Sequence, residues 1–68
     1  MDVAALDEAL KRLEAIDEAR ARVVEMRFFG GMSEQQIAEL LGVNVRTVQR
    51  YWRSGRQWLF CELEGKFS

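Results

Sequence analysis

Apolar residues recur at steps of three and four along this chain, a spacing that predicts helices. The first stripe has five members on one helix face: Val3, Leu6, Leu10, Leu13 and Ile16. Charged residues take the opposite face, so we expect an amphipathic helix over residues 2–16 with Asp2 as its cap. We interpret the stripe as a core face, while a partner-binding role stays open.

A second helix is expected over residues 18–29, with Asp17 as its cap and Glu18 suited to its positive end. Its apolar residues are too many for a one-sided surface helix: Val23, Val24, Met26, Phe28 and Phe29. We therefore predict that this helix is the most buried one. Gly30 and Gly31 should end it, because glycine accepts the left-handed conformation of a C-terminal cap.

Ser33 and Gln36 have the spacing of a capping box, which predicts a short third helix over residues 33–41. Its expected inward residues are Ile37, Leu40 and Leu41. Asn44 should cap a fourth helix over residues 45–63, and residues 65–68 should fray. The expected inward set of the fourth helix is Val48, Tyr51 or Trp52, Gly55, and Leu59 with Trp58 or Leu63.

The segment from Ser33 to Arg53 has the pattern of a helix-turn-helix. Two closely crossing helices need a small residue in the first, here Ala38, and a glycine at the turn, here Gly42. Apolar residues that should fill the angle are Ile37, Leu41, Val43, Val48 and Tyr51. We predict that residues 1–68 form a single domain, an all-α, compact four-helix domain containing this motif. A plain helical hairpin in a bundle is the alternative.

The net charge of −1 conceals an uneven distribution of charge along the 68 residues. Residues 1–26 carry seven acids and four bases, whereas residues 43–60 carry four arginines and no acid. A basic segment in a mildly acidic chain indicates a local anion-binding face. An ordinary solvated helix face is the competing interpretation.

The outward residues of the fourth helix are donors suited to DNA. Arginine binds guanine through two hydrogen bonds and glutamine binds adenine in the same way. We therefore predict base contacts for Gln49, Arg50 and Arg53. Phosphate contacts, which position a protein without reading sequence, are predicted for Ser33, Asn44, Arg46, Thr47 and Arg56.

Other chemistry finds little support in the composition. The chain has no histidine and one cysteine, Cys61, so it lacks a histidine-activated nucleophile and an internal disulfide. We expect no enzyme activity, no cofactor and no metal site. Cys61 should be buried or half-buried, and Trp52 and Trp58 should belong to the core or an interface. No apolar run approaches the roughly 18 residues of a membrane span, and a cytoplasmic location is expected.

These residues resemble region 4 of bacterial sigma factors, most closely the extracytoplasmic-function (ECF) type. The resemblance covers roughly residues 5–64. It rests on the run Arg27-Phe28-Phe29-Gly30-Gly31-Met32-Ser33, then on Ile37-Ala38, Leu41-Gly42-Val43 and Thr47-Val48. The ending Tyr51-Trp52-Arg53 with Arg56-Gln57-Trp58-Leu59 is similar to a sub-branch whose last helix is rich in tryptophan.

The resemblance implies recognition of the −35 promoter element by the fourth helix during transcription initiation. It implies base reading by Gln49, Arg50 and Arg53, with Ser54 as a further candidate, and phosphate contacts by Arg46 and Thr47. It also implies docking of the first helices on the flap of the RNA polymerase β subunit, and an anti-sigma factor as a competitor. A complete sigma factor has a region 2 that 68 residues cannot hold as well, so we expect an excised domain or a stand-alone protein.

Two other functions stay open at the level of sequence. The first is the helix-turn-helix output domain of a dimeric response regulator, which would bind half-sites about 10 base pairs apart. The second is a protein-interaction bundle that does not bind DNA, in which the arginines would meet an acidic partner.

Overall fold

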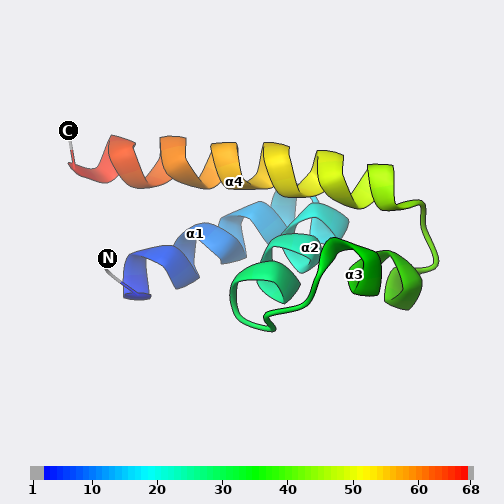
Figure 1. Ribbon diagram of the computed structural model, residues 1–68. Coiled ribbons are helices and arrows are strands. Elements are labelled where there is room, and N and C mark those ends of the chain that lie inside the picture. Colours follow the sequence, from blue (N-terminus) through cyan, green and yellow to red (C-terminus); the bar gives the residue numbers. More distant parts are fainter. Residues whose placement is uncertain (1–2, 68) are drawn as a thin grey trace.

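The computed structural model describes residues 3–67, and side chains are described for residues 3–64. This part of the chain is all helical: α1 spans Val3–Ile16, α2 Glu18–Phe28, α3 Glu34–Leu41 and α4 Val45–Phe67. The predicted all-α class and the helix-turn-helix of α3 and α4 are confirmed. Helix α4 runs along the whole molecule, with α1 beside its C-terminal half and α2 and α3 beside its N-terminal half (Figure 1). Within residues 3–67, no helix is long and apolar enough to cross a membrane.

The caps of α2 and α3 form as their side chains predict. The Asp17 carboxylate accepts a hydrogen bond from the Arg20 backbone N–H at 3.1 Å. The Ser33 hydroxyl oxygen accepts from the Gln36 N–H at 3.1 Å, and the Gln36 side chain accepts from the Ser33 N–H at 2.9 Å. The free amides at both helix starts are thereby partly satisfied. The predicted Asp2 cap lies outside the described residues.

The turn between α3 and α4 also follows the prediction. Gly42 ends α3 with φ of 68°, a left-handed conformation that glycine adopts without steric cost. The Asn44 side-chain oxygen then accepts from the Arg46 N–H at 2.8 Å and caps α4. These two residues set the angle at which α4 leaves α3.

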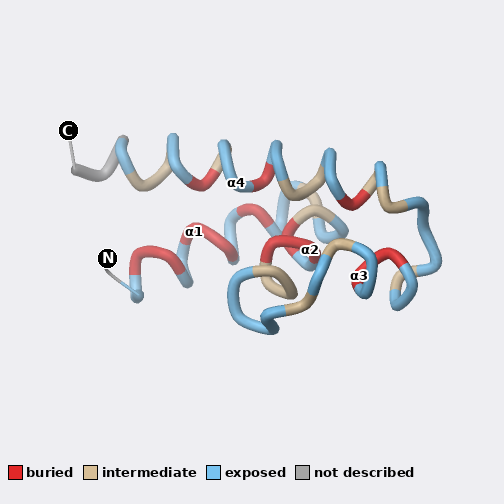
Figure 2. Tube along the Cα trace, in the orientation of Figure 1, coloured by how far each residue is buried: buried red, intermediate tan, exposed pale blue. Residues whose placement is uncertain are grey.

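The core consists of two apolar clusters that lie along the inner face of α4 (Figure 2). The first cluster, where α1, α2 and α4 meet, contains Leu6, Ala9, Leu10, Leu13, Ala21, Val24 and Leu59. The second, where α2, α3 and α4 meet, contains Val23, Ile37, Ala38 and Val48. Half-buried Trp52 packs against both clusters, and half-buried Trp58 against the first. The interpretation of the α1 stripe as core is confirmed for its three leucines, whereas Val3 and Ile16 at its ends are 69% and 67% exposed.

Several expected core positions are exposed. Helix α2 is nevertheless the central helix that was predicted, because it contacts all three other helices and only four of its 11 residues are exposed, compared with nine of 14 in α1. Phe28 and Phe29 are 43% and 62% exposed because they follow each other at the end of α2, beyond the covering helices. Leu40 is 64% exposed because Ile37 and Ala38 already supply the inner face of the short α3. Val43, in the turn, is 41% exposed.

The last part of α4 departs from two expectations. The helix continues to Phe67, beyond the end expected at residue 63, while Ser68 lies outside the described residues. Cys61 is exposed, not half-buried. Because Leu59 and Leu63 lie four residues apart on the inner face, Cys61 between them points away from it.

Candidate nucleic-acid interface

The N-terminal half of α4 presents a polar row to solvent. Val48 is fully buried, and with about 3.6 residues per turn the opposite side of the helix carries Arg46, Gln49, Arg50 and Arg53. These four residues are exposed, and together with half-buried Thr47 they line a shallow hollow. We call these five residues the α4 row. The structure thus gathers all three predicted base-contacting residues and two of the predicted phosphate-contacting ones.

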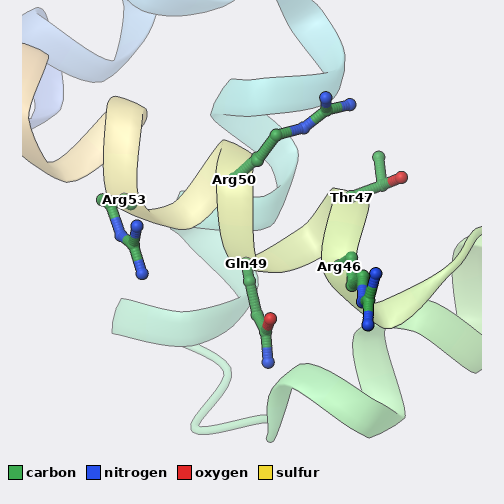
Figure 3. Close-up of a pocket in the computed structure, with 5 residues that line it drawn as sticks. All are labelled: Arg46, Thr47, Gln49, Arg50 and Arg53. Atoms are coloured by element: carbon green, nitrogen blue, oxygen red, sulfur yellow. The ribbon is translucent and has the colours of Figure 1, made fainter.

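The side chains of the α4 row diverge to two sides of the helix. Arg46, Gln49 and Arg53 extend to one side, whereas Thr47 and Arg50 extend to the other (Figure 3). The hydrogen-bond donors of the α4 row therefore cover a wider surface than side chains that all extended to one side of the helix would cover. No acidic residue lines this hollow.

The arginines of the α4 row differ from most other cations of the chain in lacking an ion-pair partner. Among the side chains described, Lys11, Arg12, Arg20 and Arg22 each form an ion pair with a carboxylate. The guanidinium groups of Arg46, Arg50 and Arg53 form none within residues 3–64. Their charge is therefore uncompensated locally, which produces a positive surface that attracts anions.

Ser33 and Asn44 lie outside the hollow, at the starts of α3 and α4. Each uses its side-chain oxygen as a cap acceptor, which leaves the Ser33 O–H and the Asn44 NH₂ as donors toward solvent. Both residues are exposed. A helix start adds a partial positive charge, so the two positions suit an anion.

Arg56 is a predicted phosphate-contacting residue that the structure places on another face of α4, away from the α4 row. It follows Arg53 by three residues and is therefore rotated around α4 toward Trp52. Its guanidinium lies over the Trp52 ring, 5.7 Å from the centroid. It borders an apolar groove lined by Leu6, Phe28, Leu59, Phe60 and Leu63.

Two arginines of α2 take part in this region without having been predicted to do so. The Arg20 guanidinium lies 5.8 Å from the centroid of the Tyr51 ring, beside the α4 row. The Arg27 guanidinium lies 5.3 Å from the Trp52 centroid, and its Nη1 donates to the Met32 carbonyl oxygen at 3.0 Å. A signal for Arg20 was present, because it precedes buried Val24 by four residues and so shares the inner face of α2.

Comparison with known proteins gives one match. A sequence model of the family described as ECF sigma factor matches residues 1–65. Searches of curated proteins and of solved structures gave no match.

Proposed function

The chain belongs to the ECF sigma factor family, and on that premise we propose that it recognises the −35 promoter element through α4. A sigma factor acts in transcription initiation and interacts with DNA and RNA polymerase. The observation that carries the proposal is the α4 row, a set of donors, four of them exposed, that has no acid in its lining and no ion pair within residues 3–64. In this function the chain is a non-enzymatic component of the cytoplasmic transcription machinery.

The α4 row has the dimensions of a major-groove reader. A major groove about 12 Å wide admits one α-helix. Gln49 and Arg53 are four residue steps apart, or about 6 Å along the helix axis, which corresponds to roughly two base-pair steps. Arg50 and Arg53 would bind guanine edges and Gln49 an adenine edge. The three residues would thus read a short sequence of adjacent base pairs.

Phosphate contacts would fix the position of α4 in the groove. Arg46 and Thr47 lie in the first turn of α4 and line the same hollow as the three residues proposed to read bases. Ser33 and Asn44 offer a hydroxyl and an amide donor at the starts of α3 and α4. Because both helix starts carry partial positive charge, a backbone phosphate bound there meets the helix dipole as well as the side chain.

The apolar groove beyond the α4 row is the proposed contact with the β-subunit flap of RNA polymerase. Phe28 and Phe60 are 43% and 58% exposed at its edges, and Leu6 and Leu59 form its buried floor. Exposed aromatic residues around an apolar groove are typical of a protein-binding surface. Helix α4 supplies much of this lining, so the docking surface is not made by the first helices alone. An anti-sigma factor would compete for it.

A selection from random DNA duplexes with the purified chain tests the proposal. We expect enrichment of one short motif, bound at roughly micromolar concentration at low salt and much more weakly as salt rises. The same selection with the chain fused to the polymerase flap should enrich the same motif more strongly. Absent or salt-independent binding in both formats would overturn the proposal.

A further inference from the structure

We infer that Arg20 of α2 and Gln57 of α4 form a second phosphate-binding edge, which contacts the DNA strand on the side of α4 away from α3. The inference rests on the proposed function, because it requires α4 in the major groove. It adds to the helix-turn-helix a DNA contact from α2. The ligand is a single backbone phosphate, bound independently of base sequence.

A second hollow borders the α4 row. It is lined by Arg20, Arg50, Tyr51, Arg53, Ser54 and Gln57. Arg50 and Arg53 line both hollows, so this edge adjoins the residues proposed to read bases. Ser54 Oγ donates to the Arg50 carbonyl oxygen at 2.9 Å, so its proton is used within the helix. This edge therefore adds the side-chain donors of Arg20 and Gln57 to those of the α4 row.

Gly55 brings Arg20 alongside α4. A Cβ atom at residue 55 would lie 2.5 Å from Val24 Cγ2 and 3.2 Å from Arg20 Cγ. The backbone of α4 therefore approaches Val24 more closely than a residue with a side chain allows, and the Arg20 stem lies in tight contact beside it. The stem packs against the helix while the guanidinium emerges at its edge, where the side chain is 31% exposed.

The Arg20 guanidinium is held in place but not saturated. Its Nη2 lies 3.5 Å from Asp17 Oδ2, and its plane is near the Tyr51 ring. Its Nε is buried and has no hydrogen-bond partner among the described residues. A guanidinium has five N–H donors, so one carboxylate contact leaves donors for a phosphate. Asp17 and Tyr51 thus restrict the side chain to the edge of the groove before DNA arrives.

The geometry of the groove explains why a contact is needed on this side. A helix in the major groove lies between two phosphate backbones. Helix α3 packs against α4 through the cluster that contains Ile37, Ala38 and Val48. Gln49 extends toward the side of α4 on which α3 lies (Figure 3). Arg20 lies over Tyr51 on the opposite side of α4, and Gln57 continues the α4 row, four residues after Arg53, into the hollow that it lines with Arg20. Contacts at α3 and at Arg20 would therefore hold both strands.

The test measures binding of the full chain to its selected duplex as a function of salt. Arg20→Gln should lower the slope of log K against log salt by about 1 and weaken binding about eightfold at 0.1 M salt, with base preference unchanged. Gln57→Glu, which places a carboxylate at the same edge, should weaken binding severalfold. The matched control is Arg22→Gln, since Arg22 lies exposed on α2 and pairs with Glu18 at 3.2 Å. This control should bind as the unchanged chain does.

A neutral methylphosphonate scanned along the duplex identifies the phosphate itself. The unchanged chain should lose affinity at one position on the far strand, and Arg20→Gln should show no further loss there. Circular dichroism reports folding. If Arg20→Gln does not fold, DNA binding by the exposed Gln57→Glu variant and the methylphosphonate scan of the unchanged chain test the inference instead. Normal affinity and slope for Gln57→Glu, together with no sensitive phosphate on that strand, would overturn the inference.

The two failures are distinguishable. If Arg50→Ala loses DNA binding while Arg20→Gln and Gln57→Glu bind normally, the inference is wrong and the proposed function stands. If the unchanged chain binds no duplex, alone or fused to the flap, the proposed function fails and the inference with it.

Discussion

The two halves of α4 bury the same inner face but offer different chemistry to solvent. In residues 45–57 the exposed side is polar and basic, from Arg46 and Gln49 to Arg56 and Gln57. In residues 58–64 exposed Phe60 lies beside an apolar groove, with exposed Cys61 and Glu64 close to it in sequence. One helix of 23 residues can therefore present a DNA-binding surface at one end and a protein-binding surface at the other.

Different neighbours support the two halves. The N-terminal half packs on α2 and α3 through Val48, and the C-terminal half packs on α1 and α2 through Leu59. Trp52 lies at the junction, with guanidinium groups 5.3 Å and 5.7 Å from its ring centroid and the Phe28 ring edge-on at 5.2 Å. The contrast teaches that the periodic inner face builds the core, while the outward residues of each half set its partner.

The largest expected effect is a difference in unfolding free energy between substitutions on the inner and the outer face of the C-terminal half of α4. Leu59→Ala should lower the free energy of unfolding by about 2–5 kcal/mol, because Leu59 is 3% exposed and its truncation leaves a cavity. Phe60→Ala, one residue along and 58% exposed, should change the unfolding free energy by less than about 1 kcal/mol. Urea denaturation followed by circular dichroism measures both. Equal losses would mean that Phe60 is also part of the core.

The next effect separates the two halves by function. Arg50→Ala should weaken duplex binding by about 1–3 kcal/mol and relax base preference, because it removes a two-bond contact with a base. Its unfolding free energy should stay unchanged, since the side chain is exposed and forms no ion pair within residues 3–64. Fluorescence anisotropy with a labelled duplex gives the affinity. Phe60→Ala is the matched control from the other half and should bind DNA normally; a loss there would show that the halves do not act separately.

Gly55→Ala tests the close packing of α4 on α2. The added methyl would meet buried Val24 Cγ2 at 2.5 Å, and a branched side chain in a core has little freedom to move. We expect the free energy of unfolding to fall by about 1–3 kcal/mol from overpacking, partly offset by better helix propensity. Thermal unfolding of this variant and of Ser54→Ala, its exposed neighbour, checks the expectation. A stabilised Gly55→Ala variant would contradict the close approach on which the placement of Arg20 depends.

The smallest effect concerns the start of α4. Asn44→Ala should cost about 1 kcal/mol of unfolding free energy, because the Arg46 N–H loses its cap acceptor at 2.8 Å. Asn44→Asp keeps the acceptor and should retain stability, but its negative charge should weaken duplex binding if a phosphate lies there. Chemical denaturation and anisotropy separate the two roles. Unchanged DNA binding by Asn44→Asp would remove Asn44 from the phosphate contacts.

Local features of this molecule could be read from the sequence alone. The caps at Asp17, Ser33 and Asn44 and the left-handed Gly42 depend on bonds and dihedrals within a few residues. The α4 row has the same origin, because residues on one helix acquire their relative positions from the helix repeat. Local interactions and the helix repeat therefore determine the four helices, the motif and the grouping of five site residues.

Only the tertiary structure decided which apolar and basic residues face inward where three helices meet. Phe28 is exposed because it lies at the end of α2, and Val43 because it lies in a turn. Leu40 is exposed because other residues of α3 already supply its inner face. Arg56 turns to Trp52, and Arg20 reaches the edge of α4 because Gly55 lets two helices approach. These positions depend on packing between segments far apart in the chain, and hydrophobic spacing within one helix carries no information about it.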